Sequence, residues 1–231
     1  IPPTAKSDSI NYQRALSGHG ARSAKTRSQL IEAAIEVIGA VGYEGASTRA
    51  LAKAANTTLS VIPYHFGGKK ELYLAAAQMI AEHARGRFEE VTIILESQSA
   101  GDGSARFEEA LIRLLHIMMD DTEPHSWTSF VARCLYDNDE AFALIHERAI
   151  APLLERLIHA ATDFSRRGPK DETLRLRISA IVTAVVSFRF LRGFMLRGMG
   201  WKSIQDNYAR QIEQLIRDLC RSEFLDVRHS Q

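Results

Sequence analysis

Cysteine is scarce in this sequence: its 231 residues include two, Cys134 and Cys220, far apart and without the spacing of metal ligands. Such cysteines are typical of buried free thiols in a reducing compartment, and they argue against a disulfide scaffold or a metal site. A secretory signal is lacking as well, because residues 1–24 are polar and contain no apolar run. We therefore expect a soluble, cytoplasmic protein without a metal ion or another cofactor.

Uninterrupted hydrophobic segments and catalytic motifs are also missing. The apolar stretch 178–196 approaches the length of a membrane span, but Arg189 and Arg192 interrupt it, which favours a buried helix. His146-Glu147 lacks the second histidine of a zinc-binding helix, and no phosphate-binding loop, nucleophile elbow or paired-carboxylate pattern is present. The sequence thus predicts no catalytic residue and argues against an enzyme.

The charge of the chain is unevenly distributed although its formal total is only +1. Residues 1–70 hold nine basic and four acidic side chains, which give +5, whereas the remaining twenty basic and twenty-four acidic side chains give −4. A basic N-terminal part on an acidic body indicates contact with a polyanion at one end of the molecule.

Helical periodicity dominates the chain, and no segment shows the alternation of a strand, so we expect an all-α fold. About nine helices are predicted, at residues 24–41, 48–54, 59–66, 69–96, 105–120, 125–136, 140–166, 171–198 and 203–224. Pro152 marks a kink or a fresh helix start within its stretch. Residues 1–24 lack a helical period and are expected to form a flexible tail, and residues 97–104 are the clearest internal boundary.

Residues 47–72 have the pattern of two short helices joined by a tight turn. The Ser47 hydroxyl is placed to cap the first helix, because serine accepts hydrogen bonds from first-turn amides. Asn56 stands at the sharp turn, where a residue that tolerates positive φ is needed. Thr57 and Thr58 can cap the second helix, which is predicted to run from Leu59 to about residue 66.

Together with residues 25–46, this stretch resembles the N-terminal domain of the tetracycline-repressor (TetR) family. The resemblance extends from about residue 25 to about residue 74. It is carried by Thr26-Arg27, Ala33-Ala34, Gly42-Tyr43, Ser47-Thr48, Leu51-Ala52 and Tyr64-His65-Phe66 followed by Lys69. It implies a three-helix DNA-binding head at 25–70 with a helix-turn-helix and a helical ligand-binding and dimerisation body at 71–225. The body also has three runs, at residues 126–139, 145–157 and 186–201, that resemble the CecR-type C-terminal domain of one branch.

Two residues depart from the family pattern. Asn56 stands where the family usually has glycine, which its tolerance of positive φ allows. Pro63 stands where the family usually has an aromatic residue on the recognition helix. Because proline lacks the N–H that would bond to the Leu59 carbonyl, it should kink or shorten that helix and remove one DNA contact.

The resemblance places DNA-binding residues in and around the second helix. Leu59, Ser60, Val61 and Tyr64 are expected to face the major groove, and Arg49 is expected to bind a guanine or, alternatively, a phosphate. Thr48, Thr57, Tyr64, His65 and Lys69 are the expected phosphate contacts, with Thr58 beside them. Because few of these side chains can form two hydrogen bonds to one base, DNA shape is expected to supply part of the specificity.

Two further sets of residues are predicted in the body. Ile178, Ile181, Val182, Val185, Phe188, Ile212, Leu215, Ile216 and Leu219 are assigned to a four-helix interface of a homodimer, or else to an internal core. His116, Met119, Trp127, Phe130, Arg133, Cys134, Tyr136 and Arg189 are candidates for a small-molecule pocket, or else for ordinary core. Arg189 in an apolar helix needs a partner, either an acidic effector or a neighbouring carboxylate.

The expected function is sequence-specific regulation of transcription, by repression as the family default. A dimer would bind a two-fold symmetric operator on double-stranded DNA, and an effector would favour a spacing of the heads that no longer fits it. The alternative is a helical ligand-binding or protein-interaction module that has lost DNA binding, which Pro63 keeps open.

Overall fold

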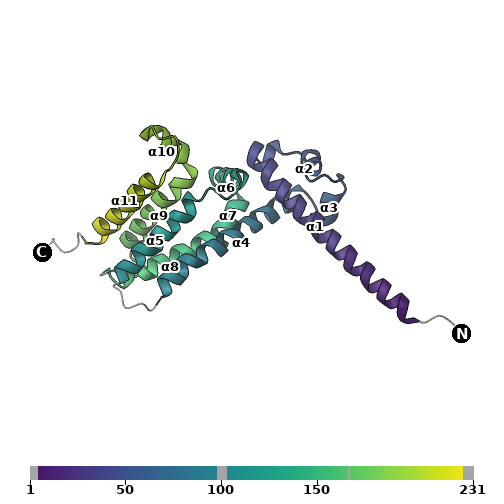
Figure 1. Cartoon of the computed structure of the whole chain (residues 1–231), viewed down its shortest axis with the longest axis horizontal. Helices are drawn as coiled ribbons and strands as arrows, with labels where there is room; N and C mark the ends of the chain where they lie inside the picture. The colour runs from purple at the N-terminus through teal and green to yellow at the C-terminus, as the bar shows by residue number, and fades with distance from the viewer. Residues whose placement is uncertain (1–4, 98–102, 166, 226–231) are drawn as a thin grey trace. The chain divides into compact units, whose positions relative to one another are not determined.

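The structure, a computed structural model, describes residues 5–97, 103–165 and 167–225, and all of its regular elements are helices (Figure 1). The expectation of an all-α fold is confirmed. In chain order the elements are α1 (Ala5–Gly45), α2 (Thr48–Ala54), α3 (Val61–Phe66), α4 (Lys69–Glu96), α5 (Gly103–Met119), α6 (His125–Asp137), α7 (Glu140–Ile145), the π-helical turn η1 (His146–Ile150), α8 (Ala151–Thr162), α9 (Glu172–Phe190), α10 (Arg192–Met199) and α11 (Asp206–Leu225).

Helix α1 begins much earlier than the sequence indicated. We expected a tail without helical structure through residue 24, but the helix starts at Ala5. Residues 5–23 contain no proline and only two glycines, so no residue there forbids helical backbone, and the prolines at positions 2 and 3 precede its start. At its other end, Gly42 adopts a φ of 80° and interrupts the helical backbone, as its position in the sequence predicted.

The helices of the C-terminal half are more finely divided than predicted. The stretch 140–166 forms α7, η1 and α8, because Pro152 has no amide hydrogen to bond to the carbonyl four residues earlier. The amide of Ala151 instead bonds to the carbonyl of His146, the wider turn of a π-helix. The stretch 171–198 forms α9 and α10, which are bent by 83° relative to one another.

The chain separates into two compact units that differ from the predicted domains. The head unit comprises residues 1–79 together with residues 125–141, and the body unit comprises residues 80–124 and 142–231. The sequence placed the boundary near residue 70 and assigned α6 to the body, whereas α6 packs against α1 and belongs to the head unit. An apolar helix face shows that a helix is buried, but it does not show which neighbour buries it.

The contact between α1 and α6 is close and polar at one end. Gly39 lies where the two helices meet, and a Cβ atom there would be 2.7 Å from the Ser126 carbonyl oxygen. The Arg133 guanidinium donates to the carbonyls of Gly39 at 2.8 Å and of Ala40 at 2.6 Å, near the end of the straight part of α1. These carbonyls would otherwise lack helical partners, so Arg133 completes the end of α1 and holds α6 against it.

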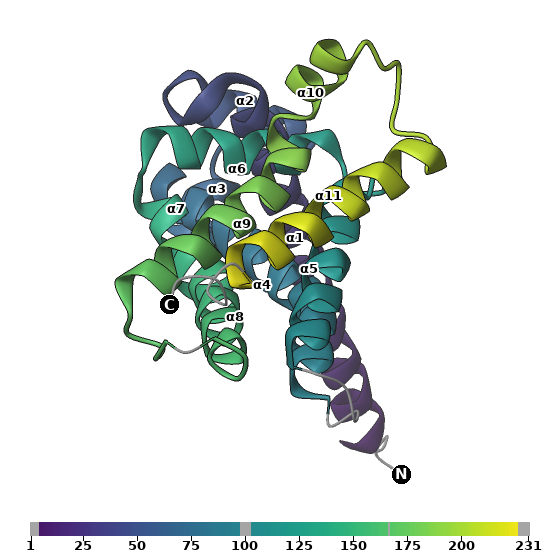
Figure 2. The same ribbon diagram turned by 90° about the vertical axis from the view of Figure 1, so that its left-hand side faces the viewer.

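The body unit is a helical bundle in which α9 packs against α5, α8 and α11 (Figure 2). Its core contains large side chains from each of these helices, among them Phe107, Leu111, Leu157, Ile178 and Ile216. Among the described residues, no single helix has both the length and the hydrophobicity of a membrane span. The bent pair α9 and α10 passes as a broken span on length and composition alone.

Candidate nucleic-acid interface

The backbone around α2 follows the signals read from the sequence. The Ser47 hydroxyl accepts from the amide of Ala50 at 3.1 Å and caps α2, as predicted. Asn56 adopts a φ of 49°, the left-handed conformation expected at the turn. The Thr57 amide then donates to the Ala52 carbonyl at 2.9 Å and closes the turn.

Helix α3 is shorter than predicted at its start. It begins at Val61 rather than at Leu59, because Pro63 cannot donate to the carbonyl of Leu59. The first helical hydrogen bond instead joins the Tyr64 amide to the Ser60 carbonyl at 3.3 Å. Pro63 therefore lies in the first turn, where an amide has no intrahelical partner and proline is tolerated.

The threonines before α3 do not cap it as expected. Ser60 occupies the position before its first helical residue, and no side chain caps α3 there. The Thr58 hydroxyl lies 3.2 Å from the Ser60 hydroxyl, so these two side chains pair with each other. The physical reason is the later start of α3, which moves the first-turn amides away from the threonine side chains.

The residues predicted to contact DNA are accessible to different extents. Tyr64 and Leu59 are large hydrophobic side chains that are nevertheless exposed, at 82% and 49%. Arg49, Thr58 and Ser60 are also exposed, whereas Thr48, Thr57, Val61, His65 and Lys69 are partly covered. None of the ten is buried, so all of them remain candidates for contact with a ligand.

A shallow hollow of about 300 Å³ lies beside the turn of the helix-turn-helix. Its lining combines two cationic side chains with polar and aliphatic ones: Arg49, Ala52, Lys53, Asn56, Thr57 and Leu59. Three of these, Arg49, Thr57 and Leu59, were predicted to bind DNA. Lys53 and Asn56 were not, although the spacing of four residues between Arg49 and Lys53 on α2 could have indicated a shared face.

Several cations of the head unit already have partners within it. The ammonium of Lys69 lies 4.1 Å from the centroid of the Tyr43 ring, and the Arg27 guanidinium lies 4.7 Å from that of Phe66. Lys70 forms an ion pair with Glu140 at 2.9 Å, which raises the pKa of the lysine. The Lys69 contact joins the start of α4 to α1, and the Arg27 contact joins α1 to α3.

Tyr73 joins three helices inside the head unit. Its ring lies 4.8 Å from that of Tyr43 and 5.3 Å from that of Phe130, measured between centroids. Its hydroxyl donates to Asp139 at 2.6 Å and lies 3.1 Å from the Cys134 sulfur. Because the hydroxyl hydrogen is engaged by Asp139, the thiol is the donor in the second contact, and burial raises the pKa of Tyr73.

The eight candidates for a ligand pocket are divided between the two units. Trp127, Phe130, Arg133, Cys134 and Tyr136 lie on α6 in the head unit, and His116, Met119 and Arg189 lie in the body unit. Phe130 and Cys134 are fully buried, whereas Tyr136 is 90% exposed. Arg133 caps α1, and the His116 ring nitrogen lies 2.7 Å from Glu213. The prediction therefore combined residues of the junction between α1 and α6 with residues of the bundle. Aromatic and sulfur-bearing side chains are common in helix junctions and in bundle cores, so residue type alone did not separate the two groups.

Both cysteines are expected to be unreactive in the folded protein. Burial raises the pKa of Cys134 and of Cys220 to about 12, so both remain thiols at neutral pH, and the thiolate is the nucleophile. Titration with an aromatic disulfide reagent at pH 8 should detect no fast-reacting thiol in the native protein and two after denaturation. A fast-reacting thiol in the native protein would contradict the burial of both.

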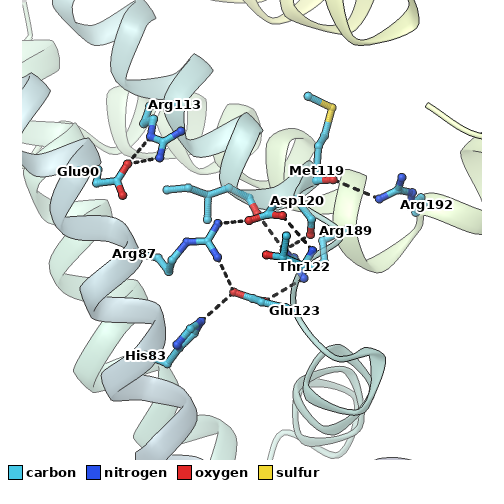
Figure 3. A network of polar contacts seen from close by, with 11 residues as sticks. His83, Arg87, Glu90, Arg113, Met119, Asp120, Thr122, Glu123, Arg189 and Arg192 are labelled. Atoms are coloured by element: carbon cyan, nitrogen blue, oxygen red, sulfur yellow. Dashed lines mark hydrogen bonds and ion pairs between the residues drawn. The ribbon is translucent and has the colours of Figure 1, made fainter. Parts of the chain in front are cut away.

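The body unit contains a network of arginines and carboxylates that the sequence did not reveal (Figure 3). Glu123 accepts from Arg87 at 3.1 Å, pairs with Arg189 at 3.0 Å and lies 3.0 Å from the His83 ring nitrogen. Arg189 also donates to the carbonyl of Asp120 at 3.0 Å. A neighbouring carboxylate, that of Glu123, thus supplies the partner that Arg189 was expected to need.

Asp120 holds the connection between α5 and α6 in the same network. Its carboxylate accepts from Arg87 at 2.7 Å and from the Thr122 amide at 2.9 Å. The amide lowers the pKa of Asp120, and Arg87 lowers it further. Arg192 pairs with Asp121 and donates to the Met119 carbonyl, so arginines satisfy the last carbonyls of α5.

The residues predicted for a dimer interface fall into two groups. Five are buried in the core of their own chain: Ile178, Ile181, Val185, Ile212 and Ile216. An enclosed side chain offers no surface to a second copy, so these five form internal core rather than an interface. Val182, Phe188 and Leu219 are only partly covered, and Leu215 is 52% exposed. Apolar residues spaced three and four apart predict burial equally in either setting.

Two family models match the chain. The model of bacterial regulatory proteins of the tetR family matches residues 30–76, and the model of the C-terminal domain of the HTH-type transcriptional dual regulator CecR matches residues 104–225, more than half of the chain. The CecR regulator of Shigella flexneri is 28% identical over 200 residues, which are 83% of this chain and 88% of that protein. The HTH-type transcriptional repressor AcnR of Corynebacterium glutamicum is 29% identical over 110 residues, 48% of this chain and 49% of that protein.

Solved structures show the same fold at low sequence identity. A TetR-like transcriptional regulator from Rhodococcus sp. RHA1 superposes with a TM-score of 0.59 at 17% identity, over 85% of this chain and 94% of that one. The fatty acid degradation regulator FadR from Bacillus halodurans gives a TM-score of 0.57 at 16% identity, over 84% of this chain and 94% of that one.

Proposed function

The chain belongs to the TetR family of bacterial regulatory proteins and carries the CecR-type C-terminal domain, and on this premise we propose that it represses transcription as a homodimer. It is a DNA-binding transcriptional regulator, as its relatives are. In the proposed mechanism, each head binds one half of a two-fold symmetric operator in the cytoplasm, and a small molecule bound by the domain at 104–225 releases it.

The observation that carries DNA binding is the exposure of the helix-turn-helix itself. Tyr64 on α3 and Leu59 just before it are large hydrophobic side chains whose surfaces are left uncovered. The N-terminal end of a recognition helix enters the major groove, where an aliphatic side chain can contact a thymine methyl. Exposed side chains of this kind support a base-reading role.

A homodimer is proposed because one six-residue recognition helix reads too few base pairs for a specific site. Two-fold pairing places two heads one helical turn of DNA apart, or a multiple of that distance. The face available for pairing is the exposed side of α9 and α11, where Leu176 and Leu215 are uncovered. The buried isoleucines of these helices pack in the core and hold α9 and α11 in place beneath that face.

Repression and effector release are proposed from the relatives. AcnR is named a repressor, whereas CecR is named a dual regulator. An effector acts on such a protein by binding one conformation better than the other, so it shifts the population away from the DNA-competent state.

The experiment that tests the proposal is selection from a pool of random duplex DNA, followed by binding of the selected duplex across a salt series. We expect a two-fold symmetric consensus and an affinity that falls steeply with salt, because phosphate contacts release counterions. A Tyr64→Ala variant, which lacks one proposed base-reading side chain, should enrich the consensus poorly while it stays folded and dimeric.

No enrichment by the folded, dimeric wild-type protein would contradict the proposal. The shortened α3 would then have lost its reading function, and the alternative of a helical ligand-binding or protein-interaction module would be favoured. A selected consensus without two-fold symmetry would leave DNA binding intact but would contradict the dimeric arrangement.

A further inference from the structure

The hollow beside the helix-turn-helix contains two cations that project from one face of α2. Arg49 and Lys53 are four residues apart, and such residues lie next to each other on a helix surface. Both side chains are exposed, and both line the hollow. Like charges at this spacing repel each other mildly, so the pair does not stabilise the folded head.

Three other cations of the head unit differ because they have partners within that unit. Lys69 lies over the Tyr43 ring, Arg27 lies over the Phe66 ring, and Lys70 is paired with Glu140. Within the part of the chain that the structure describes, no such contact involves Arg49 or Lys53. These two charges are therefore fully available to an anion that approaches the hollow.

The lining of the hollow matches a sugar–phosphate unit. Leu59, which is exposed, supplies an aliphatic surface for the apolar face of a deoxyribose, and the Lys53 ammonium supplies a point charge for its phosphate. Asn56 and Thr57 add amide and hydroxyl groups, which also bind phosphate oxygens in protein–DNA complexes. A volume of about 300 Å³ is large enough for more than a bare phosphate ion.

We propose that Lys53 binds one backbone phosphate of the operator and that the hollow receives the sugar attached to it. The inference rests on the proposed DNA-binding function and adds a positioning residue to it. Lys53 fixes the register of α3 on the duplex, while Arg49, whose planar fork suits a guanine edge, reads sequence from the rim of the same hollow.

The two roles predict different mutant behaviour. Lys53→Gln should weaken binding equally for all operator sequences, whereas Arg49→Gln should relax the preference at one base position. Each phosphate contact contributes about −0.9 to the slope of log K against log salt. Because a Lys53→Gln dimer lacks two such contacts, its slope should be less negative than that of wild type by about 1.8. That change corresponds to an affinity about 60-fold lower at 0.1 M salt and to no loss when extrapolated to 1 M.

The test measures binding of the selected duplex by wild type, Lys53→Gln, Lys53→Arg and Lys170→Gln across the salt series. Lys170 is an exposed lysine of the body unit and serves as the matched control for loss of one charge. We expect wild-type slopes for Lys53→Arg and Lys170→Gln, and unchanged thermal unfolding for all three variants, because the replaced side chains are exposed.

The phosphate itself is located by replacing single operator phosphates with uncharged methylphosphonates. At one position in each half-site, the methylphosphonate should lower the affinity of wild type but leave the affinity of Lys53→Gln unchanged. Equal sensitivity of both proteins at every position, or a wild-type slope for Lys53→Gln, would overturn the inference while leaving DNA binding established. If wild type selects no duplex at all, the proposed function fails first, and the assignment of Lys53 fails with it.

Discussion

Replacing Gly39 by alanine is expected to lower the free energy of unfolding by about 2 kcal/mol, the usual cost of overpacking a closed contact. The new Cβ would lie 2.7 Å from the Ser126 carbonyl oxygen and 3.3 Å from the Phe130 amide nitrogen. Both atoms belong to the backbone of α6, so no side chain can rotate away. Helix α6 must shift, and the bonds from Arg133 to the end of α1 are lost with it.

Gly86→Ala is the matched control for this change, because Gly86 also lies inside a helix but has no atom within 4 Å of the new Cβ. Alanine forms helices better than glycine by about 1 kcal/mol, so this variant should be more stable than wild type. Chemical denaturation of both variants checks the prediction. Stabilisation by Gly39→Ala to the same extent would show that α1 and α6 are not in close contact.

Glu123→Gln is expected to lower the free energy of unfolding by about 3 kcal/mol, the lower end of the cost of breaking a buried ion pair, because the pair is mostly covered. The Glu123 side chain is 17% exposed and that of Arg189 is 11% exposed, so water cannot fully compensate for the lost charge. Glutamine keeps the shape of the side chain but leaves Arg87 and Arg189 facing each other without the carboxylate between them (Figure 3).

The control for Glu123 is Glu96→Gln, which removes the partner of Arg156 from a pair at the surface. Exposed ion pairs contribute little to stability, so the unfolding midpoint of this variant should hardly change. Denaturation at low and high salt compares the two. Equal midpoints for the two variants would show that the network of Glu123 is as solvated as a surface pair.

The local features of the head could be predicted from the sequence because each depends on one residue type. The Ser47 cap, the positive φ of Asn56 and the interruption at Gly42 all follow from chemistry within a few positions of the chain. Pro63 also acted as expected, since it shortened α3 by removing one backbone donor. Signals of this kind need no knowledge of distant parts of the chain.

The neighbours of each helix could not be predicted in the same way. Phe130 and Cys134 indicated an apolar face on α6 but not that α1 covers it, and the isoleucines of α9 read equally as interface and as core. Gly39 was the missed signal, because a glycine inside a helix often marks a close approach of another backbone. The partners of Arg189 could not be predicted for a similar reason, since they come from residues 117–123, far from Arg189 in the sequence.

The assignment of α6 to the head unit has a consequence for synthesis and for protein engineering. A ribosome that has translated the chain as far as residue 97 has produced the whole helix-turn-helix but not the helix that covers Gly39 and Tyr73. The head therefore completes its fold only after all of α5 and α6 have emerged. For the same reason, a chimera that joins residues 1–97 to the body of another protein would expose the apolar face that α6 normally covers. A chimera that also supplies residues 125–141 would carry a complete head.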